Sequence, residues 1–155
     1  MKSSPARRSQ GESRTSFSFY PADLKVMNDA LALLEQRKVQ SDRTKLVRCL
    51  LHVSSELDLF AFAVVQHRDD SLKAGPREND YIAERVTIVI PEADLTKLDR
   101  VVAQLATKGI RANESYILRA VLRRLPPIEA LAPLVESYLE EFPDGRSKAG
   151  RAKIR

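Results

Sequence analysis

Two short stretches of the chain alternate polar and apolar side chains, and the polar set of each can form specific hydrogen bonds. Successive side chains of a strand point to opposite faces, so in residues 14–19 and 85–90 each polar set shares one face. The members of the two sets are Arg14, Ser16, Ser18, Arg85, Thr87 and Val89, the last of which interrupts the polar alternation. A guanidinium donates paired hydrogen bonds and a hydroxyl both donates and accepts, which is chemistry suited to recognising another molecule.

Residue types that carry catalysis or bind metals are scarce in the sequence. His52 and His67 are the only histidines, and neither has local partners with the spacing of a catalytic triad or a metal site. Cys49 is the single cysteine and lies among apolar residues, which is typical of a core filler. The sequence has no glycine-rich phosphate-binding loop. We therefore expect a protein that is not an enzyme and that uses no metal and no cofactor.

An internal repeat relates the two polar sets. Residues 14–54 align without a gap on residues 85–125, at an offset of 71, and 8 of the 41 aligned positions are identical. The match in apolar positions is the stronger signal of a repeated unit. The apolar pairs are Phe17/Ile88, Phe19/Ile90, Leu24/Leu95, Met27/Leu98, Leu34/Leu105, Val39/Ile110, Leu46/Ile117, Leu50/Val121 and Leu51/Leu122. The chain is thus expected to contain two copies of one structural unit.

Each copy is predicted to be a strand followed by helices. Pro21 and Pro91 end the strands near a helix start, Asp42 and Asn113 are good N-caps, and Pro133 should kink or restart its helix. Apolar spacings of three and four then indicate the helices. The expected ranges are strands 14–19 and 85–90, first helices 22–37 and 93–108, second helices 43–54 and 114–125, and third helices 55–68 and 126–142, the third packed on the outside.

The strands should pair with each other. A strand of six residues buries little and leaves backbone groups unpaired, and the only other strand is its equivalent in the second copy. Pairing 14–19 antiparallel to 85–90 gives a two-stranded ribbon lying on helices. The expected fold class is therefore mainly α with one two-stranded antiparallel ribbon, formed by two copies that pair within one chain, with an extra helix per copy.

The positive charge is concentrated at the two ends of the chain. The net charge is +5, of which residues 1–13 contribute +2 and residues 143–155 contribute +4, leaving −1 for the body. Both ends are predicted to be disordered basic tails, which either raise affinity for a polyanion or only keep the protein soluble. Residues 69–80, with Gly75-Pro76 and many charges, are predicted to link the units 14–68 and 81–142. No apolar run approaches a membrane span of about 20 residues and no secretory signal is evident, so a cytoplasmic protein is expected.

This organisation resembles the ribbon-helix-helix, or MetJ/Arc, superfamily of DNA-binding proteins. The resemblance covers about 14–54 and 85–125, and is carried by a strand followed by Pro and Asp-Leu, and by the second-helix stretches SDRTKLVRCLL (41–51) and NESYILRAVLR (113–123). Most members are homodimers in which each chain supplies one strand. A chain that carries both units is similar to the TraY-like relaxosome proteins of conjugative plasmids and to the overdrive-binding protein of Ti-plasmid T-DNA transfer. The resemblance implies a monomeric pseudo-dimer, with higher oligomers on DNA as an option.

The resemblance implies that the outer face of the ribbon enters the major groove of double-stranded DNA. Arginine can donate two hydrogen bonds to guanine, serine and threonine can contact either base type, and valine can touch a thymine methyl. The expected base-contacting residues are therefore Arg14, Ser16, Ser18, Arg85, Thr87 and Val89. The alternative is that these are ordinary solvent-facing residues of an exposed ribbon. Because the two strands differ, the preferred DNA site is expected to be an imperfect inverted repeat or asymmetric.

The start of each second helix is the expected anchor for DNA phosphates, because free backbone N–H groups and the positive end of the helix dipole gather there. Additional donors are Ser41, Arg43 and Thr44 in the first copy and Asn113 and Ser115 in the second. Asp42 and Glu114 oppose this role, and Asp42 is expected to cap its own helix. Helix capping alone is the alternative. Arg48 and Arg119 recur at one place and are expected to share a structural task, such as pairing with a carboxylate of their own copy.

Protein interaction is the other function class that the sequence leaves open. The stretch LDLFAFAVV, residues 57–65, is more apolar than one amphipathic face requires, so it is either buried against the domain or offered to a partner. An adaptor at a DNA-transfer complex or an antitoxin-like module would use such a surface. Among DNA-binding roles, the sequence does not choose between a transcriptional regulator and an accessory protein of plasmid or T-DNA transfer. Regulatory or DNA-transfer proteins are accordingly further expected partners, and a membrane is not.

Overall fold

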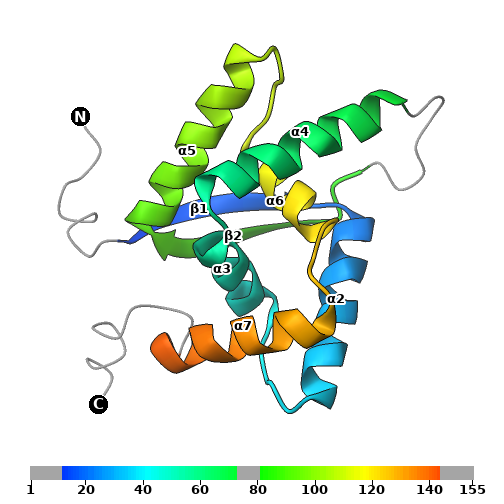
Figure 1. The fold of residues 1–155 in the computed structure, drawn as a ribbon, viewed down its shortest axis with the longest axis vertical. Coiled ribbons are helices and arrows are strands. Elements are labelled where there is room, and N and C mark those ends of the chain that lie inside the picture. Colours follow the sequence, from blue (N-terminus) through cyan, green and yellow to red (C-terminus); the bar gives the residue numbers. More distant parts are fainter. Residues whose placement is uncertain (1–11, 73–80, 144–155) are drawn as a thin grey trace.

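The computed structural model describes residues 12–72 and 81–143, in which each of two strands is followed by three helices (Figure 1). The elements are β1 (Glu12–Phe19), α2 (Pro21–Gln36), α3 (Arg43–Val53), α4 (Glu56–Leu72), β2 (Glu84–Pro91), α5 (Glu92–Thr107), α6 (Glu114–Leu122) and α7 (Ile128–Glu141). The predicted fold class, mainly α with one two-stranded antiparallel ribbon, is confirmed.

The two strands pair in the register that the repeat requires. Ser16 lies opposite Thr87, which is its own equivalent in the second copy. Two residues away on either side, Arg14 lies opposite Val89 and Ser18 lies opposite Arg85. Arg14 is equivalent to Arg85 in the repeat and Ser18 to Val89, so these two rows are also related by the repeat. An antiparallel pairing centred on one pair of equivalent residues is what a two-fold relation between the strands demands.

The apolar pattern of the repeat forms a shared core. Eight of the nine matched pairs are buried on both sides, while the pair Leu24 and Leu95 is partly buried against the same core. The inner face of the ribbon supplies Phe17 and Phe19 from β1 and Ile88 and Ile90 from β2. The period-two alternation thus separates an apolar inner face from a polar outer face, as predicted.

Each third helix packs on the opposite copy. Helix α4, from the first copy, lies across α5 and α6 of the second, and α7, from the second copy, lies against α2 and α3 of the first (Figure 1). The expectation that these helices pack on the outside is therefore corrected: they close the core of the other copy. Each copy consequently needs the other to bury its apolar surface, which makes the two copies one cooperative unit.

Several predicted boundaries need correction. Helix α4 continues to Leu72, so residues 69–72 are its last turn and not linker, because Asp69 and Asp70 are held by contacts with the second copy. Strand β1 begins at Glu12, inside the predicted tail, and α6 ends at Leu122, short of 125. Pro133 lies within one continuous helix. The remaining tail and linker predictions, on residues 1–11, 73–80 and 144–155, lie outside the described residues.

No single helix in the described ranges is long and apolar enough to cross a membrane. The pair α3 and α4 meets that test of length and composition only when the two are taken together, and they are bent by 109° at their junction.

The first helices of the two copies end in the same left-handed turn. Lys38 (φ 65°) and Gly109 (φ 79°) are equivalent in the repeat, and each is followed by a residue whose N–H donates back five residues, Val39 to Leu34 and Ile110 to Leu105, both at 2.9 Å. This is the Schellman helix end. It favours glycine because in any other residue the Cβ crowds the following carbonyl oxygen in that conformation.

The two positions predict opposite responses to substitution. Gly109→Ala is expected to lower the free energy of unfolding by about 1 kcal/mol, because a Cβ there meets nothing within 4 Å and only the backbone is strained. Lys38→Gly is expected to raise it by about 0.5 kcal/mol, since relief of the left-handed strain exceeds the added entropy of the unfolded chain. Urea unfolding of both variants measures this. Destabilisation by Lys38→Gly would contradict it.

Cys49 is a core filler, as its setting in the sequence indicates. Its side chain is 0% exposed, and burial raises the pKa of the thiol to about 12. The thiolate is the reactive form, so we expect Cys49 to resist a thiol-specific reagent at pH 8 while the protein is folded and to react fully in denaturant. Fast labelling of the native protein, measured by absorbance of the released chromophore, would contradict this burial.

Candidate nucleic-acid interface

The six predicted base-contacting residues lie together on the outer face of the ribbon. The register places them in three cross-strand rows, and partners in a row point to the same side. The rows are Arg14 with Val89, Ser16 with Thr87, and Ser18 with Arg85. Both arginines, Ser16 and Thr87 are exposed, whereas Ser18 and Val89 are half-buried. The strands are therefore paired and their polar face is open to a partner.

The outer face has hydroxyls at its centre and a guanidinium toward each end. The hydroxyls of Ser16 and Thr87 lie 3.3 Å apart, which is within hydrogen-bond distance, and either can be the donor. The two arginines lie on opposite strands and in opposite end rows. Each can therefore donate paired hydrogen bonds to a planar acceptor while the central hydroxyls adapt to donors or acceptors.

At the start of α6, both predicted phosphate-contacting residues have structural partners and still retain donors. The Asn113 side-chain oxygen accepts from the Tyr116 N–H at 2.9 Å, which is the predicted N-cap. The Ser115 hydroxyl oxygen accepts from the Ser18 N–H at 2.8 Å and so ties α6 to β1. The Asn113 amide and the Ser115 hydroxyl proton can each donate a hydrogen bond. Capping and binding are thus compatible at this end.

At the start of α3, more of the predicted phosphate-contacting groups already have hydrogen-bond partners within the protein. Asp42 caps the helix by accepting from the Lys45 N–H at 2.8 Å, as predicted. The Arg43 guanidinium donates to Glu84 at 3.0 Å and to Asn28 at 3.2 Å. The remaining two behave differently: the Ser41 hydroxyl lies 3.3 Å from the Asp42 carbonyl, and Thr44 lines a hollow of about 380 Å³ together with Asp42, Arg43 and Glu84. Two carboxylates thus border this hollow.

Arg48 and Arg119 share a structural task, but both reach across to the opposite copy. The Arg48 Nε donates to the backbone oxygen of Val89 at 2.7 Å. The Arg119 guanidinium lies over the ring of Tyr20, 4.1 Å from its centroid, in a cation–π contact. These contacts join the two copies.

The sequence reasoning missed a hollow of about 530 Å³ beside the start of α6. Three arginines from three different segments line it: Arg85 of β2, Arg111 of the loop before α6, and Arg119 of α6 itself. Asn113 and Ser115 also line it. The signal that could have pointed to it is an arginine two residues before an N-cap, a position at which the first copy has Gln40.

Comparison of the chain with protein-family models, with curated proteins and with solved structures gives no match. In the described part of the chain, no group of three or more His, Cys, Asp or Glu side chains is arranged to hold a metal ion. Function is accordingly inferred from the side chains themselves, of which the exposed ribbon face and the hollow lined by arginines are the most distinctive.

Proposed function

We propose that the chain is an intramolecular ribbon-helix-helix pseudo-dimer that binds double-stranded DNA sequence-specifically, with the outer face of β1 and β2 in the major groove. The observation that carries this proposal is the ribbon itself. Its register is centred on Ser16 and Thr87, and its outer face carries hydrogen-bonding side chains that are open to solvent. A two-stranded ribbon fits the major groove of B-form DNA, whose width is about 12 Å.

The chemistry of the face matches the edges of base pairs. In this proposal Arg14 and Arg85 contact guanine, Ser16, Ser18 and Thr87 contact either base type, and Val89 contacts a thymine methyl. Since valine lies in the second strand where Ser18 lies in the first, the two halves of the ribbon read different bases. We therefore expect the preferred site to be an imperfect inverted repeat or an asymmetric sequence.

Selection of duplexes from a random library at stated salt tests the proposal. A bound consensus with unequal halves is the expected result. A strictly palindromic consensus would contradict unequal reading by the two strands, and failure of the full chain to retain any duplex would contradict DNA binding. Salt must be fixed because phosphate contacts make every affinity depend on it.

The biological use that we propose is a transcriptional regulator or an accessory protein of plasmid or T-DNA transfer. Both uses need the same ribbon contact, so the face alone favours neither. The selected consensus separates them when it is located in DNA. A match in a promoter assigns regulation, and a match beside a transfer origin assigns transfer.

A protein-interaction role is supported by a different observation. Most of the apolar stretch 57–65 packs into the core through Leu59 and Ala63, but Leu57 is 74% exposed at the start of α4. One exposed leucine is an ordinary surface feature, whereas an adaptor would need a contiguous apolar patch. DNA binding is accordingly the function that the described residues favour.

A further inference from the structure

The starts of the two second helices, α6 and α3, differ in their electrostatics although the helices are equivalent in the repeat. The hollow at the start of α6 is lined by Arg85, Arg111 and Arg119 and by no carboxylate, since Glu114 begins the helix outside the lining. The hollow at the start of α3 is lined by Asp42, Arg43 and Glu84, and it lies against the same end of the ribbon, where Glu84 pairs with Phe19. The α6 start therefore presents arginines with no carboxylate in the lining, whereas at the α3 start Arg43 is paired with Glu84 and Asp42 adds a second carboxylate.

The α6 hollow opens beside the face that is proposed to read bases. Ser18 and Arg85, which form the last cross-strand row of that face, are also part of the lining. The Ser18 N–H donates to Ser115 of α6, so ribbon and helix start are held side by side. A DNA backbone that flanks a ribbon-filled groove would thus pass directly over this hollow.

Arg119 lines this hollow and has one side-chain N–H without a hydrogen bond. Its guanidinium is stacked on Tyr20, and its Nε is buried and makes no hydrogen bond within the described structure. A buried N–H without a partner is costly, and a shift of the guanidinium toward an acceptor bound in the hollow would remove that cost. The equivalent Nε in the first copy, that of Arg48, is already used by the carbonyl of Val89.

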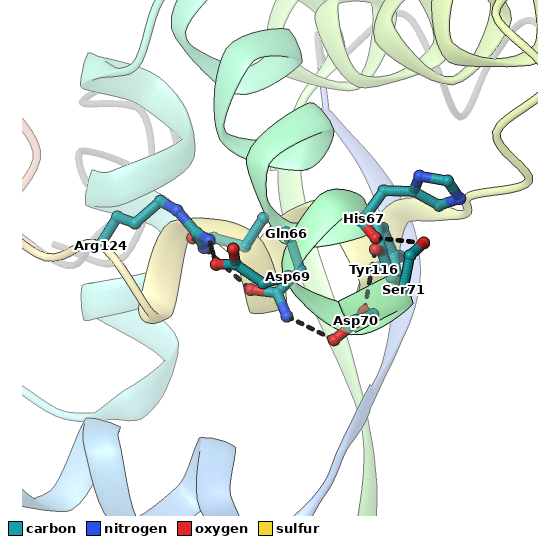
Figure 2. Close-up of polar contacts among 8 residues, drawn as sticks. Gln66, His67, Asp69, Asp70, Ser71, Tyr116 and Arg124 are labelled. Atoms are coloured by element: carbon teal, nitrogen blue, oxygen red, sulfur yellow. Dashed lines mark hydrogen bonds and ion pairs between the residues drawn. The ribbon is translucent and has the colours of Figure 1, made fainter. Parts of the chain in front are cut away.

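A polar network holds the wall of the α6 hollow in place. Figure 2 shows Asp70 of α4 accepting from the Tyr116 hydroxyl at 3.0 Å and from Gln66 at 2.9 Å, while Arg124 reaches Gln66 and Asp69. Tyr116 also lines the hollow, so α4 of the first copy fixes a binding wall of the second. Helix α3 has Lys45 where α6 has Tyr116, so its start has no phenol for such a network to hold.

We propose that the α6 hollow is the main binding site for a backbone phosphate of the DNA, and that the α3 end makes no equivalent contact. This inference rests on the proposed DNA binding. It gives the complex a polarity, which means that the protein holds the two half-sites of the DNA differently. The half-site under α6 is held by its backbone as well as by its bases, and the half-site under α3 is held by its bases alone. Arg111 is the residue that distinguishes the two ends most directly, because Gln40 takes its place in the first copy.

A pair of reciprocal exchanges tests this polarity. Arg111→Gln with Asn113→Asp gives the α6 start the residues of the α3 start at these two positions, and Gln40→Arg with Asp42→Asn does the reverse. Asparagine and aspartate are equally good N-caps, so neither exchange removes a helix cap. We expect the first exchange to weaken duplex binding roughly tenfold and to lower the salt slope by about 1, and the second to strengthen binding several-fold.

Phosphate-ethylation interference on the selected duplex locates the contact. With the natural chain, strong interference is expected on one half-site only, and it should disappear with the Arg111→Gln and Asn113→Asp exchange. Interference of equal strength on both half-sites, with tight binding retained, would overturn the polarity and leave the proposed DNA binding intact. A natural chain that retains no duplex would overturn both.

Inorganic phosphate distinguishes a backbone phosphate from a free anion. Added at constant ionic strength, it should displace the duplex no better than chloride does. Displacement by millimolar phosphate that is lost in the Arg111→Gln and Asn113→Asp exchange would assign the hollow to a free anion and overturn its assignment to the DNA backbone.

Discussion

Replacing both Arg14 and Arg85 with alanine is expected to remove most of the sequence preference and to weaken binding to the selected duplex by at least about 30-fold. A bidentate arginine contact to guanine contributes about 1–3 kcal/mol of discrimination, so two contribute at least about 2 kcal/mol. Both side chains are exposed on the outer face, away from the apolar inner face. The variant should therefore fold normally and fail in DNA binding.

A charge-matched control isolates recognition from net charge. The variant Arg37→Ala with Arg100→Ala also removes two exposed arginines, whose partners, Glu129 of α7 and Glu56 of α4, do not belong to the ribbon. Titrations at one salt concentration, against the selected duplex and a scrambled one, compare the two variants. Equal losses in both variants would show that general charge, and not the ribbon face, determines binding, and would contradict the proposed site.

The strands, the core and the outer face could be predicted because each depends on a local signal that the repeat doubles. Period-two alternation in residues 14–19 assigns Phe17 inward and Ser16 outward without knowledge of any partner. Pairing then followed by elimination, since each strand had one available partner. The observed register adds a fact that the alternation alone does not contain: the pairing is centred on Ser16 and Thr87.

The exchange of the third helices could not be predicted from periodicity. An apolar stripe shows that a helix is buried but does not say against which of two equivalent copies. Geometry at the junction decides it: only Ser54 and Ser55 separate α3 from α4, and the two helices are bent by 109°. That bend is accompanied by contacts of α4 with α5 and α6 of the second copy.

The arginine-lined hollow was missed for a related reason. Arg111 lies in a loop, where no period assigns a direction to its side chain. The position of Arg119 depends on Tyr20 of the other copy, which is a tertiary contact. Likewise, Arg43 has the composition of a phosphate ligand, and only the fold shows that Glu84 has engaged it. A charged side chain can bind a ligand only where no neighbouring side chain of opposite charge already pairs with it.

Two equivalent contacts to a buried aspartate join the copies and are expected to differ in their contribution to stability. Arg123 contacts Asp23 of the first copy at 2.6 Å, and its repeat equivalent, His52, contacts Asp94 of the second copy at 3.1 Å. Asp23 is almost completely buried and also accepts from the Tyr20 N–H at 2.9 Å. Asp94 also has the Lys97 ammonium at 3.5 Å. Asp23 therefore depends on Arg123 more than Asp94 depends on His52.

Arg123→Ala is expected to lower the free energy of unfolding by about 3 kcal/mol, because it leaves the buried Asp23 carboxylate without its cation. The corresponding fall in Tm is roughly 10 °C for a domain of this size. His52→Ala, the equivalent change, should cost less than half as much, since Lys97 remains beside Asp94. Thermal and urea unfolding of both variants measure the difference.

A second substitution separates an unpaired charge from simple loss of packing. Adding Asp23→Asn to Arg123→Ala removes the buried charge and keeps an oxygen for the Tyr20 N–H, so the double variant should be more stable than Arg123→Ala alone. If packing of the arginine stem were the whole effect, the asparagine would restore nothing. Equal losses in Arg123→Ala and His52→Ala would likewise contradict the argument, because the two junctions would then be equivalent in energy as well as in sequence position.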